Sequence, residues 1–249
     1  MLYAKNTPNN AGVMIYGDNK DFEALYAALH AVVGEEGEFA SYEGAYYRVL
    51  GVCYDIRHAL MGDREIEFVD NGMDQEKMRR LSMISNDKNV YLAIHVLWPE
   101  MLFVTMALND FVRLYAMKKS KKNYDYMLNK RTIWDAALAH VRMLQSAIAE
   151  AIKETVTEAA FSRTMNLMIK DYTWFDDYAT QYVDLLNIRF LEMDREKRLK
   201  NITIMAKRLA EKGTEYQRVR ADVIEAAGKY NCSMNEIRLN LEFPEEIDW

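Results

Sequence analysis

The chain has 249 residues, half of them hydrophobic and 28% charged, and its formal net charge is −6 at pH 7. That balance is typical of a folded protein with a substantial core and argues against an intrinsically disordered chain. The excess of acidic residues argues against general nucleic-acid binding, which needs a basic surface.

The composition also bears on cellular location. Cys53 and Cys232 are the only cysteines, and they lack the spacing of a zinc site or a disulfide framework. The first ten residues do not read as a signal peptide. The most apolar segment, residues 90–112, is too interrupted by polar residues to span a membrane. We therefore expect a soluble cytoplasmic protein that does not enter a membrane.

Glycine and proline divide the chain into two parts. Eight of the ten glycines lie between Gly12 and Gly72, and no proline occurs between Pro99 and Pro244. Because both residues disfavour helix interiors, the first part should be mixed and the second strongly helical. In chain order, the first part should contain a strand at 12–16, a helix at 22–33, a helix at 42–61, a half-buried strand at 64–69, a buried strand at 89–98 and a helix from 99 to about 117.

The second part begins with a basic segment at 118–131, which we expect to be an exposed connection. One apolar stripe from Ala137 to Ala159 then predicts a single long helix. The remaining elements should be a helix from about 174, a bend or break at 194–200, a helix opened by a capping box at Thr214, and a strand at 237–243 that returns to the sheet. The alternative for the last segment is a short helix capped by Ser233 and Glu236.

The predicted fold is therefore α+β and predominantly helical, with a small sheet and its helices in the first half and a helical bundle in the second. Residues 1–117 should form the α+β part, which residues 233–249 are expected to complete. Residues 118–131 would be the basic connection, and residues 132–232 the helical bundle.

The stretch YDIRHALMGDREIEF, residues 54–68, is unusually rich in ionisable groups. Asp55 and His58 lie three residues apart on one helix, so Asp55 could orient His58 as a general base, with Arg57 or Arg64 binding an anion. The favoured interpretation is structural, with paired charges on a solvated helix face followed by a turn and a strand.

A narrow polar stripe interrupts the apolar helix at 98–117. Thr105, Asn109 and Arg113 recur at spacings of four, with Asp110 beside them. A buried arginine needs a partner, so the stripe predicts either the floor of a pocket in which Arg113 holds a carboxylate or phosphate, or a structural polar network. The structural network is the favoured interpretation.

A third candidate is the acidic face formed by Asp177, Gln181 and Asp184, whose spacing resembles a carboxylate site for a hard cation. A solvated acidic face is the favoured interpretation, so we expect no metal site and no cofactor. The motifs of phosphate-binding loops, dinucleotide-binding folds, serine hydrolases and zinc peptidases are absent from the sequence.

Three stretches carry a resemblance to known sequences: YDIRHALMGDREIEF, LWPEMLFVTMALNDF and DYTWFDDYATQYVDLLN. Through them the chain resembles, over essentially its full length, a family of bacterial cytoplasmic proteins with no assigned activity. The resemblance implies a bacterial cytoplasmic origin and transfers no catalytic residue.

Two functional hypotheses follow. The first is a non-enzymatic interaction or regulatory protein that acts through helical surfaces, by self-association as a homo-oligomer or with a protein partner. It rests on the many aromatic and methionine residues along the helices and on the missing catalytic motifs. The second is an enzyme that acts on an anionic carboxylate or phosphate substrate and uses Asp55 and His58 with nearby arginines.

Overall fold

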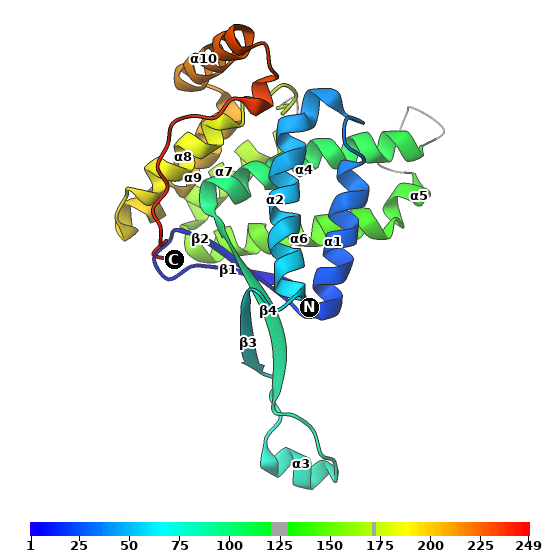
Figure 1. The fold of residues 1–249 in the computed structure, drawn as a ribbon. Coiled ribbons are helices and arrows are strands. Elements are labelled where there is room, and N and C mark those ends of the chain that lie inside the picture. Colours follow the sequence, from blue (N-terminus) through cyan, green and yellow to red (C-terminus); the bar gives the residue numbers. More distant parts are fainter. Residues whose placement is uncertain (121–128, 171–172) are drawn as a thin grey trace.

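A computed structural model describes residues 1–120, 129–170 and 173–249 of the chain. Its sheet has four antiparallel strands in the order β1–β2–β4–β3 (Figure 1). The strands are β1 (Tyr3–Asn6), β2 (Gly12–Gly17), β3 (Glu65–Asp70) and β4 (Lys88–Leu97). Val13, Ile15 and Ile94 lie on one face of the sheet and are fully buried, so this face forms one wall of the core.

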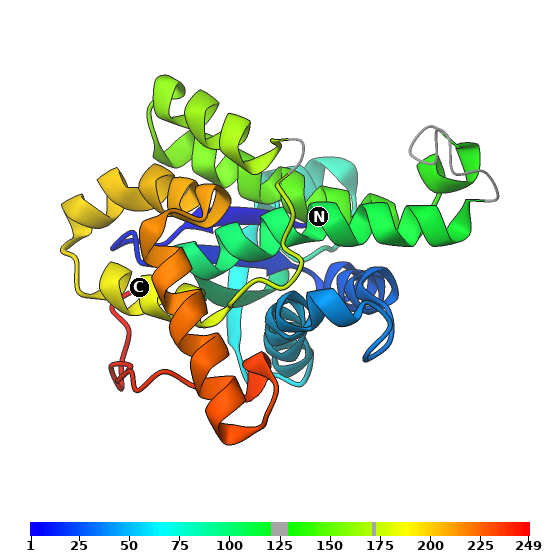
Figure 2. The same ribbon diagram turned by 90° about the horizontal axis from the view of Figure 1, so that it is seen from above.

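Three helices of the first half pack around this wall: α1 (Asn19–Val33), α2 (Glu43–Leu60) and α4 (Trp98–Lys119). An Asp18 capping box opens α1, and Pro99 stands at the start of α4. Buried residues occupy nearly every side of α4, which contacts the sheet and helices from both halves of the chain. The view from above shows α1 and α2 together on one side of this central helix (Figure 2).

The second half is helical. It comprises α5 (Lys130–Ile133), α6 (Ala136–Thr155), α7 (Glu158–Met168), α8 (Gln181–Leu191), α9 (Arg195–Glu211) and α10 (Thr214–Tyr230). Short 3-10 turns lie at η1 (Ala40–Tyr42) and η3 (Met234–Glu236). The structure confirms the predominantly helical α+β class. Buried residues of both halves form one core cluster, because α6 packs on β1 and α1.

Two helices predicted for the second half have other bounds in the structure, and the predicted break between helices is confirmed. The stripe from Ala137 to Ala159 belongs to two helices, because α6 ends at Thr155 and Thr157 caps α7. The helix predicted from about 174 begins only at Gln181, because Asp177 adopts a left-handed φ of 46° that ends any helix before it. The predicted bend near residue 194 is confirmed as a break, where Asp194 caps α9.

The predicted strand at 237–243 is wrong. Ser233 and Glu236 form the capping box of η3, and the segment after it has no ladder partner among the described strands. It returns to the sheet in another way, because Trp249 stacks on His95 of β4 with ring centroids 4.8 Å apart. The segment thus crosses the outer face of the sheet and does not extend an edge. Most of the predicted basic connection, residues 121–128, lies outside the described residues.

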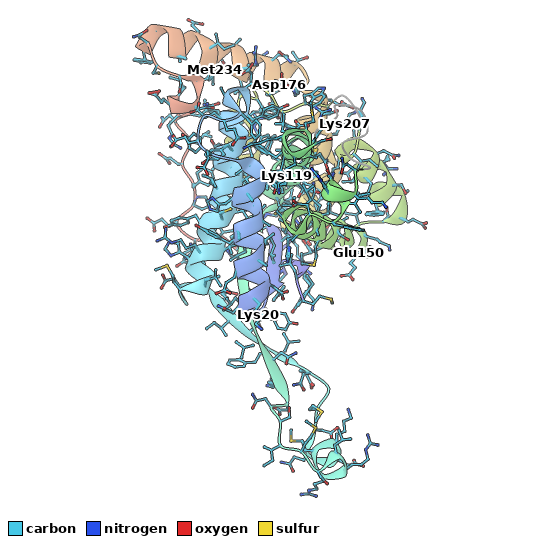
Figure 3. The ribbon with its side chains drawn as sticks, turned by 90° about the vertical axis from the view of Figure 1, so that its right-hand side faces the viewer. Lys20, Lys119, Glu150, Asp176, Lys207 and Met234 are labelled. Carbon is cyan, nitrogen blue, oxygen red and sulfur yellow. The ribbon has the colours of Figure 1, made fainter. Side chains whose placement is uncertain are left out.

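A ribbon formed by β3, the outer half of β4 and the helix α3 (Gln75–Leu81) projects away from the body (Figures 1 and 3). We call residues 65–92 the arm. Its strand β3 is exposed, where the sequence predicted a half-buried strand, because no helix covers it. Within the described part of the chain, no helix is long and apolar enough to cross a membrane.

Candidate functional site

Two ion pairs form within the charged stretch of residues 54–68, and a third joins Glu65 to Nδ1 of His95 at 3.7 Å. Arg64 binds Asp55 at 2.8 Å, and Asp63 lies 3.2 Å from Nδ1 of His58. Asp55 therefore faces Arg64 and does not orient His58 as the sequence suggested, while Arg57 is exposed. The side chains of Asp55 and Arg64 are each about one-third exposed, at 32% and 34%. Such pairs contribute little to stability. The catalytic role of Asp55 and His58 stays a prediction.

The residues of the polar stripe of α4 make two separate sets of contacts. Asn109 donates through Nδ2 to the Met168 carbonyl, and its Oδ1 accepts from Arg142 and Gln145. Gln145 also donates to the backbone carbonyl of Thr105. These bonds fasten α6 and the end of α7 to α4, which is a structural network.

Asp110 and Arg113 hold the segment that precedes α8. Asp110 is buried and accepts a hydrogen bond from the backbone N–H of Phe175 at 2.8 Å. Burial raises the pKa of Asp110 to about 6, although the Phe175 hydrogen bond and the charge of Arg113 oppose the shift. The Arg113 guanidinium lies over the Trp174 ring, where the sequence predicted an anionic partner.

A pocket of about 760 Å³ lies elsewhere, between α2 and the first turns of α4 and α8. The segment around η3 lines another side of it. Its volume is in the range of small-molecule sites. It is lined by Glu43, Gly44, Tyr47, Arg48, Gly51, Glu100, Thr180, Asp184, Ser233, Asn235, Glu236 and Arg238.

A hydrogen-bonded charge cluster forms the wall of this pocket. Arg48 donates through Nη1 to Glu100 at 3.0 Å and through Nη2 to Asp184 at 2.7 Å. Nη2 also donates to the Thr180 carbonyl at 2.9 Å, and Asn187 donates to the same Glu100 oxygen at 2.9 Å. The cluster joins three helices that are remote in sequence.

Burial changes the ionisation of this cluster. The Arg48 and Glu100 side chains are only 19% and 18% exposed. Burial raises the pKa of the Glu100 carboxyl, and the nearby Arg48 charge only partly offsets it. Burial also acts to lower the pKa of Arg48, but the charges and hydrogen bonds of Glu100 and Asp184 raise it overall. Arg48 therefore stays positively charged, and Glu100 takes up a proton more easily than an ordinary glutamate.

Two glycines of α2 shape the pocket. Gly44 and Gly51 flank Arg48 on the same side of the helix. A Cβ at Gly44 would lie 2.8 Å from Oδ1 of Asn235, so Gly44 permits the close approach of η3. A Cβ at Gly51 would meet no atom within 4 Å, because this position faces open space. The prediction from sequence missed this pocket, although two glycines inside one helix with an arginine between them are a signal that could have found it.

Unpaired oxygen atoms lie behind the pocket wall. Among the described residues, Oδ1 of Asn187 and Oε1 of Gln181 are buried without a hydrogen-bond partner. The amide nitrogen of Gln181 donates to the carbonyls of Met234 and Ile237, which holds the η3 segment against α8. The wall is thus polar, but two buried oxygen atoms behind it have no hydrogen-bond partner within the described part of the chain.

The acidic face predicted as an alternative cation site does not form. Asp177 precedes α8 and donates its backbone N–H to the Ser41 carbonyl, while Asp184 binds Arg48. In the described part of the chain, no group of three or more histidine, cysteine, aspartate or glutamate residues could hold a metal ion.

A family model described as a domain of unknown function, DUF6904, matches residues 2–249. The chain therefore belongs to the DUF6904 family. No curated protein and no solved structure matches it.

Proposed function

We propose that this DUF6904 protein binds a small polar molecule with a positively charged nitrogen group, such as an amine or a guanidine, in the pocket beside Arg48. The observation that carries the proposal is the charge of the pocket wall. Four carboxylates, Glu43, Glu100, Asp184 and Glu236, face two guanidiniums, Arg48 and Arg238. A cavity of about 760 Å³ with this lining favours a cationic ligand.

The hydrogen bonds of Arg48 also favour a cationic ligand over an anionic one. Its two terminal nitrogens already donate to Glu100, Asp184 and Thr180. Three of the five N–H donors of Arg48 are used in these bonds, which leaves only two of them and Arg238 for an anion. An anion at those donors would lie close to carboxylates of the same charge, which repel it. A cation would instead use the spare lone pairs of the carboxylates, since each oxygen accepts more than one hydrogen bond.

The proposal is tested by calorimetry with defined probes. Putrescine and agmatine serve as cationic probes, and phosphate and citrate as anionic ones. We expect saturable binding of at least one cationic probe and none of the anions. The double variant Glu43→Gln/Glu236→Gln keeps the shape of the rim and should weaken cation binding at least tenfold, or about 1.4 kcal/mol.

The matched control is Glu245→Gln, which removes an exposed carboxylate outside the pocket lining. This variant should bind the cation as the wild-type protein does. Binding of an anion alone, or cation binding that survives the double variant, would contradict the proposal.

Self-association or binding of a protein partner is a second candidate function. It is favoured by the exposed apolar side chains of the arm, among them Phe68, Met83 and Ile84. The cytoplasmic location also stays a prediction; it is supported by Cys53 and Cys232, which are both free thiols.

A further inference from the structure

We infer that the arm is a dimerisation element whose apolar face packs against the arm of a second copy of this chain. The inference rests on the second candidate function, self-association, and does not depend on the pocket. It rests on where the apolar side chains of residues 65–92 lie and on what covers them within the chain.

One face of the arm continues the core face of the sheet. Ile66 pairs with Leu92 and Phe68 with Val90, so these four side chains lie on the same side as the buried Ile94. Near the body this side is covered by helices. Farther out it is not, and Phe68 is 64% exposed. The apolar surface of the core thus extends beyond the helices that protect it.

The tip of the arm adds to this exposed surface. No residue of α3 is buried, and the turn that follows exposes Met83 and leaves Ile84 fully exposed. A seven-residue helix and a two-stranded ribbon are each marginal in water without packing. A contact outside the chain would supply the burial that the arm lacks.

The charges of the arm indicate which surface makes the contact. The open edge of β3 carries Glu65 and Glu67, which disfavour edge-to-edge pairing of two copies. On the apolar face, by contrast, Asp70 stands opposite Lys88 at the outer end. A two-fold axis would bring the acid of one copy toward the base of the other, so this face is complementary to itself.

The position of the arm allows a second copy to reach this face. The arm projects clear of the body, so that the arm of another copy can approach it (Figure 3). An isologous dimer would bury the same apolar face on both copies.

The test is the molar mass of the full chain by light scattering during size-exclusion chromatography over a range of concentrations. We expect twice the chain mass for the wild-type protein at about 100 μM. Phe68→Glu, in the ribbon, and Ile84→Glu, at the tip, should each raise the dissociation constant at least tenfold, because each places a charge in the interface. Both positions are exposed, so the body should keep its circular dichroism spectrum.

Trp134→Ser is the matched control, since Trp134 is a large exposed apolar residue on another part of the molecule. This variant should remain dimeric. Amide hydrogen exchange of residues 65–92 should also slow as the concentration rises. A monomer at about 100 μM, or a dimer that both glutamate variants leave intact, would overturn the inference.

Discussion

The Arg48 guanidinium lies 3.0 Å from the Glu100 carboxylate, although 52 positions separate the two residues along the chain. This contact joins the second turn of α2 to the first turn of α4. Through Nη2, Arg48 also reaches Asp184 at the start of α8. One side chain therefore sets the spacing of three helices, and it also forms the wall of the proposed binding pocket.

Replacement of Arg48 by methionine should lower the free energy of unfolding by about 3 kcal/mol, because it leaves Glu100 buried without its cation. Urea denaturation measures this loss. The matched control is Arg64→Met, which breaks the surface pair with Asp55 and should cost less than about 1 kcal/mol. Equal losses in the two variants would show that the Arg48 cluster is no more stabilising than a surface ion pair.

The buried Asp110 should make stability depend on pH. Its pKa is about 6 in the folded protein, whereas an unfolded aspartate titrates near 4. Between these values the folded state holds the extra proton, so the unfolding free energy contributed by Asp110 falls as the pH rises. The total loss should be on the order of 2–3 kcal/mol.

Asp110→Asn tests this dependence, because asparagine cannot ionise but can still accept the Phe175 hydrogen bond. As the pH rises from 4 to 7, the unfolding free energy of the wild-type protein should fall relative to that of the variant. Asp87→Asn, in the exposed arm, controls for removal of a surface carboxylate. A difference that stays constant with pH would exclude Asp110 as the source.

The two glycines of α2 give a matched pair of substitutions. Gly51→Ala should raise the unfolding free energy by about 0.5–1 kcal/mol, because alanine favours the helix and its Cβ meets no atom. Gly44→Ala gains the same helix propensity. However, its Cβ would lie 3.0 Å from Cγ2 of Thr180 as well as against Asn235. It should therefore be less stable than Gly51→Ala in thermal unfolding. The opposite order would contradict the close packing at Gly44.

Local signals in the sequence identified most of the individual elements. The Gly34 terminator, Pro99 and the apolar run of residues 99–117 predicted helices that the structure contains. The errors fall where a local sequence pattern is compatible with two different structures. The alternation at 237–243 resembled a strand, but only the position of this segment over the outer face of the sheet decided that it has no ladder partner.

The sequence by itself determined the fold class, since glycine and proline content and helical periodicity act over a few residues. Only the tertiary structure decided which charges meet. The partners of Arg48 come from α4 and α8, and no periodicity links positions so far apart. The arm is a similar case, because the alternation of Ile66 and Phe68 predicts a strand with one apolar face. Whether that face is covered depends on where the helices end in space.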